Sequence, residues 1–497
     1  MTSDRTASPD TGTGTGTGQS VPAGGHGAGT GRLPFAVAGL VLGILMSVLD
    51  QTVVAIALPD IAADLGEAGS IGWIVTAYVL ASTATGAVYG RLSDRFGRRA
   101  VFLSAITVFT VASALCGLAQ SMPQLIAART LQGVGAGALF TVPSIALAEL
   151  FPLRLRARVQ GYVGGVFALA SVGGPLVGGS LTDAAGWRWI FYVNLPIGLL
   201  SIALVATSLR LPRSGDGARM DVAGAVLLAG ATVSLLLVTE WGGRTHSWTS
   251  PAVLGLVVTA LALAAAFWWQ ERRAAAPLIP PRLFAGRTLR VVFPATALLG
   301  ALLYGSIVFL PTYLQVAFDL SATQAGLAGN PYFITFIVVS AITGGRAGRS
   351  GRFTPYLLSG AVIVVPGLLL LSRADLDSPY ALVAAGMAVL GVGFGLIMQN
   401  LMTVAQNAVR PADLGAVTSA VVTVRGFGMA VGVALFNNLL IRHVGDDQRP
   451  EAIAGAVPEV LVWGVAPAVA LVALMAAMPR AEASGRAGAA PETVRPS

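Results

Sequence analysis

The chain has 497 residues, of which 55% are hydrophobic and 11% are charged, and its mean hydropathy is +0.75. This composition excludes an ordinary soluble globular protein and indicates a chain that crosses a membrane many times. The formal net charge is +8, and all 31 basic residues are arginine. With one cysteine (Cys116) and three histidines, we expect no disulfide, no metal site and no cofactor.

Apolar segments of spanning length begin at Pro34 and recur to the C-terminal end. Residues 1–31 are rich in Thr, Gly and Ser, so we expect disordered cytoplasmic tails over 1–34 and, after the last apolar segment, over 479–497. The apolar pattern predicts fourteen membrane helices at 35–58, 71–91, 100–119, 124–149, 159–182, 189–211, 221–241, 251–270, 290–316, 327–345, 354–372, 380–406, 414–441 and 457–478.

The placement of the arginines indicates which ends of these helices face the cytoplasm. With the N-terminus inside, 24 arginines fall on the inner side and 5 on the outer side, and Arg129 and Arg425 lie within helices. Inner loops of membrane proteins carry an excess of positive charge, so we expect a multi-pass protein with both termini cytoplasmic. Arginine in place of lysine suggests a GC-rich genome, and we expect the plasma membrane of a bacterium.

A charged turn separates the second and third predicted helices, over residues 90–99. Four arginines within nine residues cannot cross hydrocarbon cheaply, and positive charge alone is typical of a topogenic loop. Such a loop does not explain the aspartate, which has to pair locally or lie at a helix N-terminus, or the spacing of the glycines. The residues that we single out in this turn are Gly90, Asp94, Arg95, Gly97, Arg98 and Arg99.

This string resembles the G-x-L-(S/A)-D-R-x-G-R-R motif between the second and third helices of the major facilitator superfamily. The resemblance implies that Asp94 and its arginines form a latch against a helix end in the other half of a transporter. Residues 345–352 look like a shorter copy without the aspartate, which favours a duplicated core. We therefore expect an all-α major facilitator fold, with six-helix bundles at 35–211 and 290–478 and two inserted helices within 212–289.

Two ionisable residues lie deep in predicted helices of the first bundle. Asp50 has apolar neighbours and no cation in sequence reach, and burial favours its neutral form, as proton coupling or cation binding requires. Arg129 stays charged and must face a carboxylate, carbonyls or water. The alternatives are an aspartate neutralised by hydrogen bonds to a neighbouring helix and a purely structural ion pair. The two strings resemble the L-D-x-T-V-V-x-x-A-L-P motif of fourteen-helix drug:proton antiporters, with Ala55 where asparagine is commoner, and the R-x-x-Q-G-x-G-A motif, which the family assigns to proton transfer.

The fifth predicted helix is rich in glycine around a proline. On physical grounds glycines four apart allow close helix packing, and the proline bends the helix. The pattern also resembles the G-x-x-x-G-P-x-x-G-G motif of exporters, which favours efflux over uptake. Its residues are Gly174, Pro175, Gly178 and Gly179. The following segment 187–196 closely matches the sixth-helix entry of the fourteen-helix branch, and its aromatic residues indicate an interfacial belt.

Other polar residues have two readings each. Glu240 is a second carboxylate for cations or is merely solvated at the interface, and Arg425 balances a carboxylate or contacts substrate. Glu149 belongs to the latch region, with Arg154, Arg156 and Arg158 as expected partners. Second-half amides line the cavity or form interhelical hydrogen bonds: Gln315, Gln399, Asn400, Gln406 and Asn407.

Together these motifs predict a proton-coupled efflux antiporter that exports lipophilic drugs or antibiotics by alternating access, and not an enzyme. We expect a monomer in lipid whose partners are protons and a small lipophilic substrate, without nucleic acid. The two acidic candidates hint at lipophilic cations. The alternatives are a dedicated exporter of one metabolite or self-made antibiotic and, from another class, a non-transporting membrane receptor or sensor.

Overall fold

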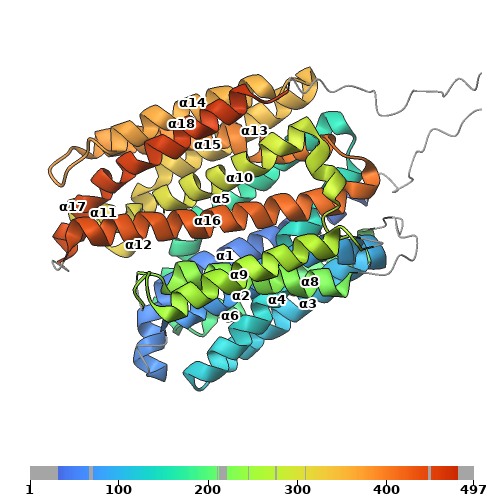
Figure 1. The fold of residues 1–497 in the computed structure, drawn as a ribbon. Coiled ribbons are helices and arrows are strands. Elements are labelled where there is room, and N and C mark those ends of the chain that lie inside the picture. Colours follow the sequence, from blue (N-terminus) through green and yellow to red (C-terminus); the bar gives the residue numbers. More distant parts are fainter. Residues whose placement is uncertain are drawn as a thin grey trace, which may run out of the picture.

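A computed structural model describes residues 32–66, 71–209, 211, 221–243, 246–274, 277–307, 309–445 and 449–479. All long elements in this part of the chain are α-helices, arranged as two bundles (Figure 1). The expected tails, apart from 32–34 and 479, lie outside the described residues.

The first bundle contains α1 (Leu33–Leu65), α2 (Ile71–Phe96), α3 (Arg98–Leu118), α4 (Met122–Leu150), α5 (Leu153–Ala185), α6 (Trp189–Tyr192) and α7 (Asn194–Ser208). The turn between α2 and α3 is a single residue, Gly97, with φ of 88°. Glycine adopts this left-handed conformation without steric cost, which allows so abrupt a reversal.

The inserted pair is α8 (Val222–Trp241) and α9 (Pro251–Glu271). Both begin at a side-chain cap, since Asp221 accepts from the Gly224 N–H and Ser250 from the Val253 N–H. The two helices pack on each other, and α8 also lies against α2 and α16 (Figure 1, green). The insertion therefore covers one side of the boundary between the bundles.

The second bundle contains η2 (Pro281–Ala285), α10 (Arg287–Ile307), α11 (Leu310–Ala317), α12 (Ala322–Ala328), α13 (Asn330–Ser350), α14 (Thr354–Leu371), α15 (Tyr380–Asn407), η3 (Pro411–Asp413), α16 (Leu414–Val444), α17 (Pro450–Leu461), η4 (Val462–Gly464) and α18 (Val465–Ala476). The predicted span 290–316 is interrupted before α11. Pro311 lies in the first turn of α11, where a helix tolerates its missing N–H.

Each of the fourteen predicted spans coincides with one of these helices or with consecutive helices. Eleven helical segments in the described residues are long and apolar enough to cross a membrane. The other three predicted spans correspond to α2, α5 and α13, which have 26, 33 and 21 residues. These three pack at the boundary between the bundles, where glycine and polar residues replace the apolar surface that lipid requires.

The two bundles repeat one packing pattern. The first helix of each bundle packs on the fifth and sixth, as α1 does on α5 and α7 and as α10 does on α16 and α18. Across the boundary, α2 packs on α16 and α5 on α13, so the second helix of each half meets the fifth of the other. This exchange is what a duplicated six-helix unit with approximate twofold symmetry produces.

Candidate functional site

Asp50 and Arg129 form a buried ion pair within the first bundle. The Arg129 Nη1 atom lies 2.5 Å from Asp50 Oδ2, and the two side chains are 1% and 0% exposed. The other carboxylate oxygen accepts from Gln132 Nε2 at 2.8 Å and from Asn194 Nδ2 at 3.1 Å. The expectation of apolar surroundings is therefore wrong, because α4 and α7 bring polar partners, and the cation that the sequence near Asp50 lacks, to α1 from far along the chain.

Arg129 also contacts α2. Its Nε atom donates to the Ile74 carbonyl at 3.2 Å, and its guanidinium carbon lies 4.2 Å from the centre of the Tyr78 ring. Removing one partner of a buried pair typically costs about 3–5 kcal/mol, because the other charge stays uncompensated. Arg129 thus joins the carboxylate on α1 to a carbonyl and a ring on α2.

Two glycines of α5 keep that helix close to α1 beside Asp50. A Cβ atom at Gly174 would collide with Thr52 Oγ1, and one at Gly178 would lie 3.0 Å from Val53 Cγ1. Gly173, by contrast, has open space where a Cβ would be. Gly179 is half-buried, and the side chain of Pro175 lies outside the described residues. Gly174 and Gly178 form a glycine seam that places α5 directly against Thr52 and Val53 of α1.

The charged turn contains a compact ionic cluster at one end of the bundle, which we call the latch end. Arg98 Nη2 lies 2.5 Å from Asp94 Oδ1 and 2.7 Å from Glu149 Oε1. Arg98 Nη1 also donates to Ser93 Oγ at 2.6 Å. Glu149 thus belongs to the latch region, but its ion-pair partner in the described residues is Arg98 rather than the expected arginines of α5.

Asp94 lies against the first turn of α16, in the other bundle. A Cβ atom at Gly415 would lie 2.5 Å and 2.6 Å from the two Asp94 oxygens, and one at Gly90 would lie 2.5 Å from the Gly415 carbonyl oxygen. Free N–H groups at a helix N-terminus favour a carboxylate. Burial raises the pKa of Asp94, whereas Arg98 acts to lower it. Arg95 and Arg99 are exposed and do not join the cluster.

A polar layer lies deeper at the same boundary. Gln406 Nε2 donates to Thr418 Oγ1 at 3.1 Å and, at 3.4 Å, to the Ser144 carbonyl in the first bundle. Gln160 Nε2 donates to Gln406 Oε1 at 3.5 Å. These bonds across the boundary are long, so they hold the bundles together only weakly. Of the two roles expected for Gln406, the structure shows interhelical hydrogen bonding.

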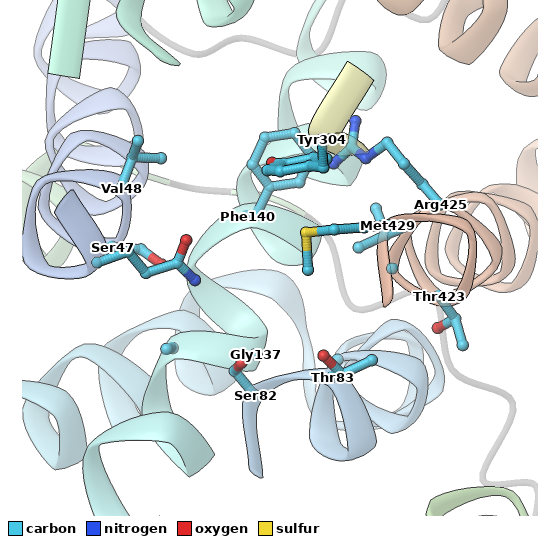
Figure 2. Close-up of a pocket in the computed structure, with 15 residues that line it drawn as sticks. Ser47, Val48, Ser82, Thr83, Gly137, Phe140, Tyr304, Thr423, Arg425 and Met429 are labelled. Carbon is cyan, nitrogen blue, oxygen red and sulfur yellow. The ribbon is translucent and has the colours of Figure 1, made fainter. Parts of the chain in front are cut away.

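A central cavity of about 130 Å³ lies between the bundles. The first bundle contributes Val48 and Gln51, on either side of Asp50 along α1, as well as Phe140 of α4. The second contributes Tyr304 of α10 and part of α16. Figure 2 shows these side chains around the cavity, with Arg425 reaching from α16 towards Phe140 and Tyr304.

Arg425 has no carboxylate within ion-pair distance among the described residues. Its guanidinium carbon lies 4.8 Å from the centre of the Phe140 ring, and its ionisable neighbour is Tyr304. The expectation that Arg425 balances a carboxylate is therefore wrong for this part of the structure. Its second predicted role, contact with substrate, remains a prediction.

A larger side cavity of about 390 Å³ lies between α2, α8, α10 and α16. Its lining is mostly apolar and includes Leu236 and Thr239 of the inserted helix α8. Tyr304 and Met429 line both cavities, so the two are adjacent. The side chain of Glu240, on the same helix as Leu236, lies outside the described residues.

At the end opposite the latch, Trp187 is buried and donates to Asp64 Oδ2 at 3.0 Å. Arg188 pairs with the same oxygen at 2.7 Å. Trp187 is therefore part of a clamp on α1 and not of the interfacial belt, whereas Trp189 is exposed as that belt requires. Sequence reasoning also missed Asn194, although an isolated amide in an apolar segment was a usable signal.

Comparison with known proteins gives a consistent set of relatives. The family model described as Major Facilitator Superfamily matches residues 40–433. An uncharacterized MFS-type transporter of Mycobacterium tuberculosis is 37% identical over 439 residues, which cover 88% of this chain and 64% of that protein. The multidrug transporter protein MdtP of Bacillus subtilis is 34% identical over 410 residues, which cover 82% of this chain and 76% of that protein.

Among solved structures, the human organic anion transporter MFSD10 (TETRAN) superposes with a TM-score of 0.65. The match covers 89% of this chain and 99% of that one, at 16% sequence identity. Identity at this level supports the shared fold and no more.

Proposed function

The chain belongs to the major facilitator superfamily, and from that premise we propose that it exports small lipophilic compounds, drugs or antibiotics among them, in exchange for protons. Relatives that carry names of multidrug transporters support export, as does the glycine seam of α5, which resembles an exporter motif. The transporter is a multi-pass membrane protein. We further propose a monomer in the bacterial plasma membrane with both termini and the latch end in the cytoplasm, as the arginine distribution favours.

The observation that carries this proposal is the buried Asp50–Arg129 pair beside the central cavity. Two residues that line the cavity lie close to Asp50 along α1. Val48 is two residues before it, and Gln51 directly follows it. A carboxylate so placed can exchange a proton with a hydrated cavity and change its bond to Arg129. Membrane helices retain such ionisable groups mainly at ion or substrate pathways.

Proton uptake by Asp50 removes the negative charge that compensates Arg129. The guanidinium cannot lose its own proton, so it has to draw on its other partners, which include Gln132 Oε1 on its own helix and the Ile74 carbonyl and Tyr78 ring on α2. Helix α2 also carries Asp94 of the latch and packs on α16. Protonation of Asp50 is thereby linked to the boundary between the two bundles, which must open when the transporter changes its accessible side.

The test uses the purified protein in liposomes with an imposed pH gradient, and it measures substrate flux and proton counterflux together. The substrates come from a resistance screen in an efflux-deficient bacterium, with and without a protonophore. Wild-type protein should couple the two fluxes. Asp50→Asn should abolish gradient-driven export while membrane insertion stays intact.

A matched control is Asp64→Asn, which removes an exposed carboxylate on the same helix and should leave both fluxes unchanged. Normal resistance and normal proton counterflux in Asp50→Asn would refute the coupling role. A panel of unrelated substrates separates a multidrug exporter from a dedicated one, and absence of any flux would favour a receptor or sensor.

A further inference from the structure

We propose that the two cavities together bind an amphipathic acid, with an oxyanion head at Arg425 and an apolar body in the side cavity. This inference rests on the proposed export function and specifies its substrate class.

The head-group position follows from the unused donors of Arg425. A guanidinium carries five N–H donors, yet Arg425 makes no hydrogen bond or ion pair with any described residue. Phe140 covers one face of the group, and Figure 2 shows the side chain lying along the cavity beside Tyr304. Arg425 is half-buried at the wall of the cavity, and a carboxylate or other oxyanion bound there would supply charge-assisted hydrogen bonds to its free N–H groups.

The charge expected of the ligand follows from the residues that line the two cavities. Among the described residues that line either cavity there is no Asp or Glu. Asp50 is next to Gln51 of the lining, but its oxygens are occupied by Arg129, Gln132 and Asn194, and its side chain is 0% exposed. Among the described residues, a cationic ligand would meet Arg425 without a compensating carboxylate. The geometry therefore opposes the lipophilic cations that the acidic residues of the sequence suggested.

The apolar body follows from volume and lining. Ligand pockets usually measure roughly 300–1,000 Å³, so the central cavity at about 130 Å³ accommodates a head group, and the side cavity at about 390 Å³ a larger body. Val79, Leu236, Phe309 and Val433 give the side cavity an apolar wall. Met429 stands between the two spaces, and its flexible thioether side chain can move to join them.

The experiment measures binding to the full-length protein in nanodiscs by fluorescence. The probes are a dansyl-labelled undecanoic acid, its primary amide and the amine with the same chain, and empty nanodiscs correct for partition into lipid. Wild-type protein should bind the acid roughly tenfold to a hundredfold more tightly than the amine. Equal affinities for the three head groups would overturn the proposal without recourse to any variant.

Three variants locate the site. Arg425→Gln should remove the preference for the acid, Arg425→Lys should keep part of it, and the exposed control Arg373→Gln should keep all of it. Val433→Phe, which fills the side cavity, should weaken binding of the long-chain acid and leave competition by acetate, which occupies the head-group position alone, unchanged. An acid preference that survives in Arg425→Gln would assign the head group elsewhere and contradict the proposal.

The binding measurement needs no pH gradient, so it is independent of the export assay. Selective binding without gradient-driven flux of the acid would uphold the site and contradict proton-coupled export. Gradient-driven flux of other compounds together with unselective binding of the three probes would uphold proton-coupled export and contradict the acid-binding site.

Discussion

The two bundles share one helix packing but differ in where they place charge. In the first bundle, Asp50 and Arg129 lie in the interior, and the turn after α2 carries the Asp94–Arg98–Glu149 cluster. In the second bundle the interior is aromatic and aliphatic, with Tyr332 stacked on Phe336. Helix packing is therefore alike in the two bundles, whereas among the described residues an ion pair with both side chains buried, Asp50–Arg129, lies in the first bundle alone.

The turns show the same asymmetry. The counterpart of the charged turn ends α13, and its arginines, Arg346, Arg349 and Arg352, are exposed. They have no ion-pair partner among the described residues. In the second bundle, Asp413 forms ion pairs with Arg282 and Arg410 just before α16. Arg425, further along α16, faces the central cavity. We propose that the first bundle handles protons and the latch, and that the second presents a cation to substrate.

The largest effect is expected when the buried ion pair of the first bundle is broken. Arg129→Gln leaves the Asp50 carboxylate without its cation and should lower the free energy of unfolding by about 3–5 kcal/mol. The double variant Asp50→Asn/Arg129→Gln removes both charges and should recover most of that stability but no gradient-driven export. Thermal unfolding in detergent and flux in liposomes check the two parts. Export by the stable double variant would make the pair purely structural.

The next effect tests the two turns against each other. Arg98→Gln removes the cation shared by Asp94 and Glu149, and should cost roughly 1.5–3 kcal/mol and most of the transport rate. Arg349→Gln, at an exposed site of the corresponding turn, should change neither quantity. Unfolding and flux are measured on both variants. Equal losses in the two would show that charge alone matters at these turns.

How far sequence leads can be judged from these residues. The helices and the charged turn were predictable because hydropathy and a contiguous motif are local properties. Asp50 and Arg129 were recognisable as candidates that could act on each other, but the Asn194 partner of Asp50 was not, because 144 residues separate the two and only tertiary packing makes them neighbours. The same holds for the partner of Glu149. The exposure of Arg425 to a cavity depends on the rotation of α16, which its sequence does not fix because polar and apolar residues are spread around the helix without a distinct apolar face.

A smaller effect is expected at the seam between α5 and α1. Gly178→Ala places a methyl group 3.0–3.3 Å from atoms of Val53, including its backbone, and should cost roughly 1 kcal/mol and slow export several-fold. Gly173→Ala is the matched control, because nothing lies within 4 Å of the added Cβ. Initial flux rates at saturating substrate compare them. An unaffected Gly178 variant would remove the seam from the mechanism.

The smallest effect concerns the clamp at the opposite end. Arg188 and Trp187 hold the pKa of Asp64 below its ordinary value of 3.8, so any stabilisation is present above that value and is lost as the pH falls through the lowered pKa. Between about pH 5 and pH 8, wild-type protein and Asp64→Asn should show the same pH dependence of unfolding temperature, since exposed pairs contribute little. A divergence within this window would assign Asp64 a titrating role.

The 31-residue helix α16 runs from the latch to both cavities without interruption. Gly415, beside Asp94, and Arg425 are ten residues apart, which corresponds to about 15 Å at 1.5 Å per residue. A helix of this kind acts as a lever arm: a tilt of about 10° pivoting at Arg425 would move Gly415 by about 2.6 Å. Such a shift exceeds what a hydrogen bond or close ion pair tolerates, so a small adjustment around a bound head group is enough to release the opposite end.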